Sequence, residues 1–155
     1  MGIGSSTSFN PLAYQGRWYE ITKYPFPFES DCDAATADYI YRQPYLQVVN
    51  TCYSNGQPIR QDIGIATPKE KPGVLSLSFD YELLFGQQSQ GSSIPSFPSS
   101  YIVLWTDYTN WSFVGSANKM FFWVLSRKPS VTTDDWAFIG KKVQELGYDT
   151  SKLTV

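Results

Sequence analysis

The sequence contains no histidine and only two cysteines among its 155 residues. The missing histidine excludes Ser–His and Cys–His nucleophile pairs, as well as zinc or haem bound through imidazole. Two cysteines cannot form a four-thiolate zinc site within one chain. We therefore assign no catalytic residue, metal or cofactor, and expect a protein that is not an enzyme.

Clustered positive charge is also lacking. The net charge is −2, and the Lys141-Lys142 pair is the most basic stretch, so a nucleic-acid footprint is not expected. No apolar run reaches the length of about 18 residues that indicates a membrane-spanning helix. The first residues lack the charged start and apolar core of a secretion signal.

The N-terminal segment reads Met1-Gly2-Ile3-Gly4-Ser5-Ser6, which matches the pattern for N-myristoylation at Gly2. A flexible leader of small residues explains the same letters. A single myristoyl chain would give only marginal, peripheral membrane association. We place residues 1–10 in a flexible leader and 11–155 in one domain. The oligomeric state stays open.

Aromatic residues are abundant, with 10 Phe, 11 Tyr and 5 Trp, and they favour half-buried pleated surfaces. Eight short alternating segments are separated by turn residues, with connections mostly too short for parallel crossovers. The pattern predicts an all-β fold of eight antiparallel strands in a meander, either a sandwich or an up-and-down barrel. The expected strands are Arg17–Tyr24, Ala34–Tyr41, Leu46–Tyr53, Arg60–Thr67, Val74–Leu84, Tyr101–Thr106, Ser112–Gly115 and Met120–Ser126.

Two segments interrupt this rhythm. Residues 86–100 are rich in Ser, Gln, Gly and Pro and predict a long surface loop. Residues 132–146 change to helical periodicity, with a capping box at Thr132 and Asp135. We expect this helix to pack on the outside of the sheet through an apolar stripe, and residues 151–155 to form a short ninth strand. The stripe consists of Trp136, Ile139, Val143 and Leu146.

Three short motifs occur in order along this pattern: Gly16-x-Trp18, Thr106-Asp107 after the sixth strand, and Arg127 after the eighth. Together they resemble the conserved regions of the lipocalins, within the calycin fold. The resemblance covers about residues 10–153 and is closest to the bacterial lipocalin and apolipoprotein D branch. The 86–100 loop departs from typical bacterial members. The resemblance implies an eight-stranded antiparallel up-and-down barrel that acts as a carrier, and structural roles for the motif residues.

The motif has a direct physical interpretation. We expect the Arg127 guanidinium to lie across the Trp18 indole at the closed base, a cation–π contact of about 0.5–2 kcal/mol. The turn at Thr106 and Asp107 should hydrogen-bond neighbouring backbone.

Strand alternation, with the parity that the resemblance implies for the last strands, selects the side chains that face the interior. This set is apolar and aromatic with a few hydroxyls, as a lipid pocket requires. Small inward residues would leave a cavity, whereas large aromatics could fill the barrel completely. The predicted ligand-binding residues are Ala37, Tyr39, Val48, Asn50, Leu75, Leu77, Phe79, Tyr101, Val103, Trp105, Phe121 and Trp123.

We expect the protein to bind and carry or store a small hydrophobic or amphipathic ligand, such as a fatty acid or lysophospholipid. One alternative is a ligand-free module that binds a protein partner through its barrel-mouth loops. Another is an isomerase that uses a cavity thiol, for which Cys52 has suitable inward parity, although no residue near it in sequence would lower its pKa.

Cys32 and Cys52 lie at the far ends of an expected hairpin. With a symmetric turn, Cys32 would face position 55, so a disulfide would need a longer turn or a bulge. The pairing stays open at this point. A bridge favours a secreted, periplasmic or other extracellular setting, including a virion. Free thiols favour the cytoplasm, with lipidation at Gly2.

Overall fold

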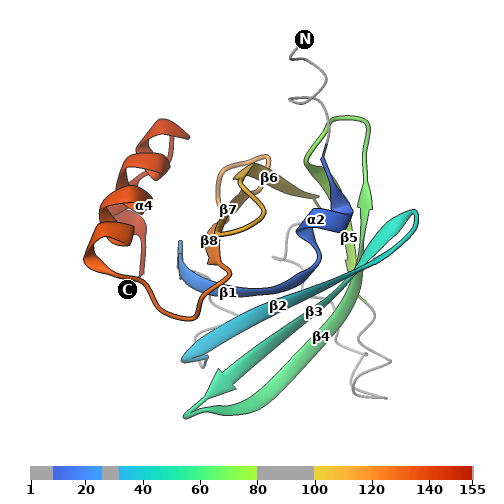
Figure 1. The fold of residues 1–155 in the computed structure, drawn as a ribbon, viewed down its shortest axis with the longest axis horizontal. Coiled ribbons are helices and arrows are strands. Elements are labelled where there is room, and N and C mark those ends of the chain that lie inside the picture. Colours follow the sequence, from blue (N-terminus) through green and yellow to red (C-terminus); the bar gives the residue numbers. More distant parts are fainter. Residues whose placement is uncertain (1–8, 26–31, 80–99, 155) are drawn as a thin grey trace.

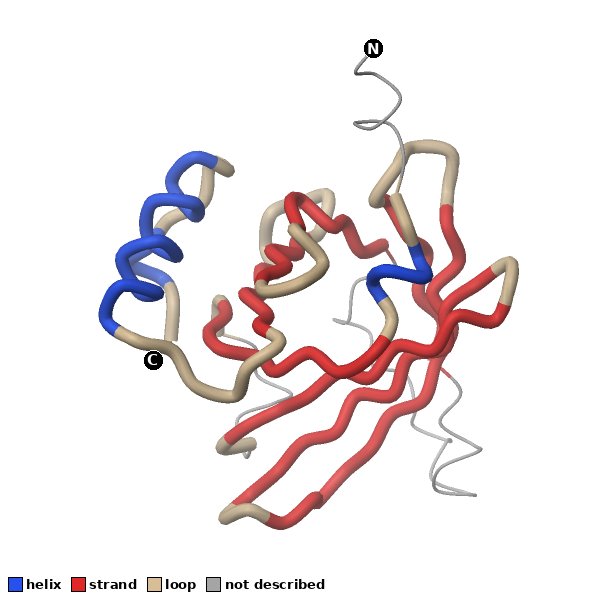
Figure 2. Tube along the Cα trace, viewed as in Figure 1, coloured by secondary structure: helices blue, strands red, loops and turns tan. Residues whose placement is uncertain are grey.

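The computed structural model describes residues 9–25, 32–79 and 100–154, leaving aside the side chains of 77–79 and 100. Eight antiparallel strands form a closed barrel in sequence order, with β1 paired to β8 (Figures 1 and 2). None of the described helices is long and apolar enough to cross a membrane. The strands are β1 (Gly16–Lys23), β2 (Ala34–Arg42), β3 (Tyr45–Ser54), β4 (Gln57–Pro68), β5 (Val74–Phe79), β6 (Ser100–Thr106), β7 (Trp111–Gly115) and β8 (Phe122–Ser126).

The barrel wall follows the predicted alternation over most of its length. In β3, Leu46 and Val48 are buried in the interior, and the register places Val48 beside Tyr39 of β2 and Gly64 of β4. Gly64 and Ala66 are buried, which fixes the inward parity of β4. The all-β, up-and-down meander predicted from the short connections is confirmed.

A short helix that is not evident from the sequence pattern closes the base of the barrel. Helix α2 (Pro11–Tyr14) begins at Asn10, whose Oδ1 accepts a hydrogen bond from the Ala13 amide at 3.2 Å. The Phe9 ring lies 5.1 Å from the Tyr14 ring. Phe9 and Asn10 thus contact the barrel, although the sequence placed them in the leader. Residues 1–8, including Gly2, lie outside the described part.

Helix α4 (Thr133–Glu145) packs on the outside of the barrel beside β7 and β8, as predicted (Figure 1). Thr132 and Asp135 form the expected capping box. Ile139 and Val143 are buried, but Trp136 is 36% exposed, so the stripe was wrong at its first position. Phe138 packs against the barrel in its place.

The ninth strand was not correctly predicted. A 3₁₀ helix (Thr150–Lys152) occupies that segment, because Asp149 caps it by accepting from the Ser151 amide. The chain still returns to the barrel wall: the Thr154 amide donates to the carbonyl of Lys23, the last residue of β1, at 2.9 Å.

A bulge in β6 also changes which residues face inward. The β6–β7 register shifts between Val103 and Trp105, so that Val103 pairs with inward-facing Val114 and Trp105 pairs with outward-facing Phe113. One extra residue in a strand reverses the parity beyond it. Trp105 therefore lies outside, against α4, with its ring 6.0 Å from that of Phe138.

Candidate ligand cavity

The floor of the barrel is formed by Arg127 and Trp18. The guanidinium carbon lies 3.7 Å from the centre of the indole ring, the stack that the sequence predicts. Trp18 is fully buried, and its Nε1 donates to the Tyr14 carbonyl at 2.9 Å. Arg127 also donates to the last carbonyls of α2, Ala13, Tyr14 and Gln15, at 3.1–3.3 Å. One side chain thus caps a helix and supports an aromatic plug.

The turn between β6 and β7 lies at the same end. Thr106 Oγ1 donates to the Trp111 carbonyl at 2.7 Å and accepts from the Tyr108 amide at 2.9 Å. Asp107 Oδ1 accepts from the Asn110 and Trp111 amides, both at 2.8 Å. The Arg127 Nε then donates to the Tyr108 carbonyl at 3.0 Å. These contacts link the turn to the plug through backbone groups.

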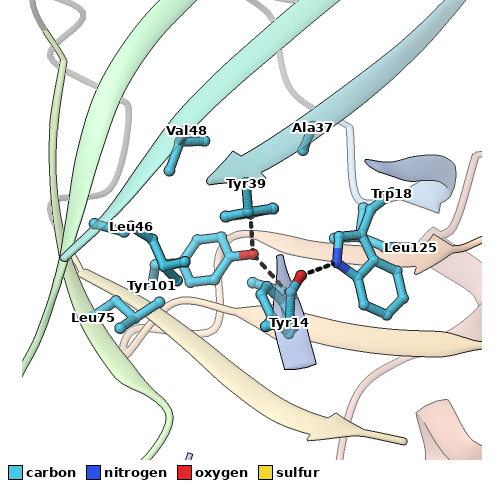
Figure 3. Packing of buried hydrophobic residues seen from close by; sticks show 11 residues of the cluster. Tyr14, Trp18, Ala37, Tyr39, Leu46, Val48, Leu75, Tyr101 and Leu125 are labelled. Atoms are coloured by element: carbon cyan, nitrogen blue, oxygen red, sulfur yellow. Dashed lines mark hydrogen bonds between the residues drawn. The ribbon is translucent and has the colours of Figure 1, made fainter. Parts of the chain in front are cut away.

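Above the plug, tyrosine rings converge in the barrel interior (Figure 3). Tyr14 reaches in from α2, Tyr39 from β2 and Tyr101 from β6, and their hydroxyl groups are hydrogen-bonded in series. Burial raises the pKa of Tyr14 to about 12, and the pKa values of Tyr39 and Tyr101 also rise well above the usual 10.0. All three therefore stay neutral at physiological pH.

On the mouth side of these rings the barrel contains a cavity of about 70 Å³. One water requires about 10–15 Å³, so the interior is hollow rather than filled by side chains. The cavity wall is mostly apolar or aromatic, and its residues come from seven of the eight strands. This part of the lining includes Ala35, Ala37, Tyr39, Val48, Cys52, Tyr101, Val114, Trp123 and Leu125.

A polar group of side chains lines another part of the wall: Glu20, Asn50, Arg60 and Asp62. Arg60 Nε lies 3.9 Å from Asp62 Oδ2, and Lys23 Nζ lies 3.5 Å from Glu20 Oε2. In the register, Arg60 faces Cys52 and Asp62 faces Asn50. Charge therefore enters the cavity from β1 and β4.

Six of the twelve predicted ligand-binding residues line this cavity: Ala37, Tyr39, Val48, Asn50, Tyr101 and Trp123. Leu75 and Val103 pack in the interior without lining it, and Phe121 stacks on Trp123 with ring centres 5.9 Å apart. Trp105 lies outside the barrel because of the bulge in β6. The side chains of Leu77 and Phe79 lie outside the described residues.

Sequence reasoning missed several lining residues. Arg60 and Asp62 share the parity of Gly64 and Ala66 on β4, so the same alternation could have identified them. Val114 lies on β7, to which no inward parity was assigned. Leu125 was not missed in this way: alternation on the last strand predicts it to face inward with Trp123, and it lines the cavity beside that residue.

Cys32 and Cys52 form a disulfide, with their Cα atoms 5.4 Å apart. The β2–β3 ladder keeps the symmetric register around the Gln43-Pro44 turn, so neither a longer turn nor a bulge in that ladder brings them together. Cys32 precedes the first residue of β2 and is therefore not held to the strand register. The bridged sulfur also removes the thiol that the isomerase hypothesis requires.

The fold is a closed eight-stranded meander of the calycin class, with an internal cavity, a floor formed by Trp18 and Arg127, and one outer helix. A family model described as "Lipocalin-like domain" matches residues 12–155. The chain belongs to the lipocalin family. Lipocalins are generally proteins that bind and transport small hydrophobic molecules.

Relatives and solved structures agree with this assignment. The chain is 30% identical to the outer membrane lipoprotein Blc of Vibrio cholerae, over 97% of this chain and 87% of that protein. It is 26% identical to apolipoprotein D of Bos taurus, over 96% of this chain and 76% of that protein. Insecticyanin of Manduca sexta shares the fold, with a TM-score of 0.68 at 22% identity, over 96% of this chain and 80% of that one.

Proposed function

We propose that this lipocalin binds and carries or stores a small amphipathic ligand, such as a fatty acid or lysophospholipid, in the cavity between the tyrosine cluster and the barrel mouth. The observation that supports this most is the empty space itself, because it lies inside a closed barrel with a mainly apolar wall. Each methylene group moved from water into such a wall gains about 0.8 kcal/mol.

Polar side chains within the same wall favour an amphiphile over a plain hydrocarbon. Arg60, Asn50 and Glu20 offer donors and acceptors beside the apolar surface of Val48 and Leu125. A polar group left without partners would be unfavourable to bury, whereas these side chains allow it to be paired. Selectivity should be loose, since most of the wall is apolar.

The disulfide favours ligand binding over thiol chemistry as the function of the cavity. Cys52 reaches the cavity as part of its bridge to Cys32, so it presents no free thiolate for isomerisation. The bridge also favours an oxidising compartment. Intact mass measured after alkylation, with and without prior reduction, should differ by two alkyl groups.

Tryptophan fluorescence tests ligand entry. Trp123 lines the cavity and Trp105 lies against α4 on the outside. Titration with a fluorescent fatty-acid analogue should quench tryptophan emission saturably at micromolar concentration. Trp123→Phe should remove most of that quenching, and the matched Trp105→Phe variant should keep it. Absence of a saturable signal in the unmodified protein would contradict carriage of such ligands.

A further inference from the structure

Four hydroxyl groups form one continuous hydrogen-bonded chain at the inner end of the cavity. Ser112 Oγ lies 2.7 Å from Tyr14 Oη, and Tyr14 Oη lies 3.1 Å from Tyr101 Oη. Tyr101 Oη is hydrogen-bonded in turn to Tyr39 Oη (Figure 3). Ser112 and Tyr14 are fully buried, whereas Tyr101 and Tyr39 line the cavity. The chain therefore runs from the packed wall to the empty space.

Counting protons shows that this chain is incomplete without a further partner. Each hydroxyl carries one proton, so three bonds between four hydroxyls leave one proton over. Within the described residues, the Tyr14 and Ser112 hydroxyls make no hydrogen bonds outside this chain of hydroxyls, so a proton left on either would stay buried and unpaired. The favourable arrangement places it on Tyr39 or Tyr101. There it faces the cavity and can be donated to a molecule inside.

The inner end of the cavity suits a neutral group better than an ionised one. The burial that raises the tyrosine pKa values keeps the hydroxyls protonated and uncharged. Arg127 is committed to the Trp18 ring and to the α2 carbonyls. Arg60 faces Cys52 in the register, four residues along β3 from the Val48–Tyr39 pair, roughly 13 Å away at strand rise. A carboxylate next to the tyrosines would be buried without a paired cation.

We propose that Tyr39 and Tyr101 form a polar anchor that binds a neutral hydroxyl or carbonyl group at the inward end of the ligand. The apolar body of the ligand would then contact Val48, Val114 and Leu125, and an ionised group would remain with the charged side chains of β1 and β4. The inference rests on the proposed function and adds the ligand's orientation and the chemistry of its inner end. The preferred ligand is an amphiphile with a polar group at each end.

Two probes of equal chain length test the anchor: decanoic acid and 10-hydroxydecanoic acid, each measured by calorimetry on the full chain. A net hydrogen bond is worth about 0.5–1.5 kcal/mol, so the hydroxy acid should bind about two- to tenfold more tightly. Without an anchor, a hydroxyl forced into an apolar end would instead weaken binding. The sign of the preference therefore decides, and the unmodified protein alone provides it.

Variants locate the anchor. In Tyr39→Phe and Tyr101→Phe the preference for the hydroxy acid should fall to at most parity, while decanoic acid still binds. Tyr41→Phe is the matched control, because Tyr41 packs at the next inward position of β2 and does not line the cavity. It should keep the preference. Near-ultraviolet circular dichroism compares the folded state of each variant with that of the unmodified protein.

Each outcome has one meaning. Preference for decanoic acid in the unmodified protein would overturn the anchor and leave the carrier function standing. Failure of both acids to bind would overturn the carrier function, and the anchor with it. A preference for the hydroxy acid that survives in both Tyr39→Phe and Tyr101→Phe would show that other groups bind the hydroxyl, which also overturns the anchor.

Discussion

Two hydrophobic clusters lie on opposite sides of the same barrel wall, and they are built differently. The inner cluster surrounds the cavity and includes Tyr14, Trp18, Tyr39 and Tyr101. Its rings carry hydroxyl groups bonded to one another, and it leaves space unfilled. The outer cluster lies between the barrel and α4; its buried members are Tyr24, Phe113, Phe122, Val124, Ile139, Val143 and Tyr148.

The outer cluster is tightly packed. The Phe122 and Tyr148 rings stack with centres 4.4 Å apart. A Cβ added at Gly115 would lie 2.6 Å from the Tyr148 hydroxyl and 3.1 Å from Leu104 Cδ1, so that close approach requires glycine. Dense packing on the outside fixes the shape of the barrel wall. The interior can therefore stay partly empty without collapse.

Neighbouring substitutions on β7 should give the largest difference between the two clusters. Phe113 is fully buried in the outer cluster, and Val114 is fully buried at the cavity wall. Phe113→Ala should lower the free energy of unfolding by about 3–5 kcal/mol, and Val114→Ala by about 1–2 kcal/mol, because less surface is lost and a void is already adjacent. Urea denaturation measures both. Equal losses would contradict the comparison.

Replacing the Arg127 guanidinium should have the next largest effect on stability, and this effect should be confined to the floor of the inner cluster. Lysine keeps the charge but cannot reach several carbonyls at once. Arg127→Lys should lower the free energy of unfolding by about 1.5–3 kcal/mol, the range for hydrogen bonds to a charged group. Lys128→Arg, at the exposed neighbouring position, is the control and should change little. Calorimetric melting of both variants measures the effect.

Alkaline pH should destabilise the inner cluster selectively. The pKa of Tyr14 is about 12 when folded and 10.0 in the unfolded reference, so the folded state holds the proton more tightly. Stability is fully present below pH 10 and falls as the pH rises toward 12. At pH 11, the raised pKa of Tyr14 alone should lower the free energy of unfolding by about 1.4 kcal/mol relative to pH 9. The raised pKa values of Tyr39 and Tyr101 should lower it further. In Tyr14→Phe the pH slope of the urea midpoint should be shallower; an unchanged slope would refute this assignment.

The smallest effect should come from the helix cap, which serves only the outer cluster. Thr132 Oγ1 accepts from the Asp135 amide at 3.1 Å, and Asp135 Oδ2 accepts from the Thr132 amide at 2.9 Å. Thr132→Ala should cost about 1 kcal/mol in urea unfolding, and Thr133→Ala at the next, exposed position much less. Binding of a cavity probe should be the same in both variants. A change in binding would mean that the two clusters are coupled.

The sequence predicted the strands and the motif contacts because each depends on local chemistry. Two-residue alternation placed Val48, Tyr39 and Ala37 in the interior, and the short turns required antiparallel neighbours. The Trp18–Arg127 stack followed from the resemblance to lipocalins.

What could not be predicted depended on irregular backbone. The bulge between Val103 and Trp105 carries no distinctive residue, so simple alternation placed Trp105 on the wrong side. Helix α2 is four residues long, too short for a periodic signal, although Asn10 followed by Pro11 is a recognisable helix start. The hydroxyl chain required Tyr14, and hence that helix, to be known first.

The contacts of Arg127 also constrain the order in which the barrel can fold during synthesis. Its guanidinium bonds to the Arg17 carbonyl, 110 residues earlier, and to three residues before that, while β8 completes the ring against β1. A growing polypeptide therefore exposes β1 and α2 long before β8 and Arg127 leave the ribosome. Contacts between such distant segments slow folding. The base of the barrel must be sealed near the end of synthesis, and a nascent chain stopped before β8 would remain an open sheet.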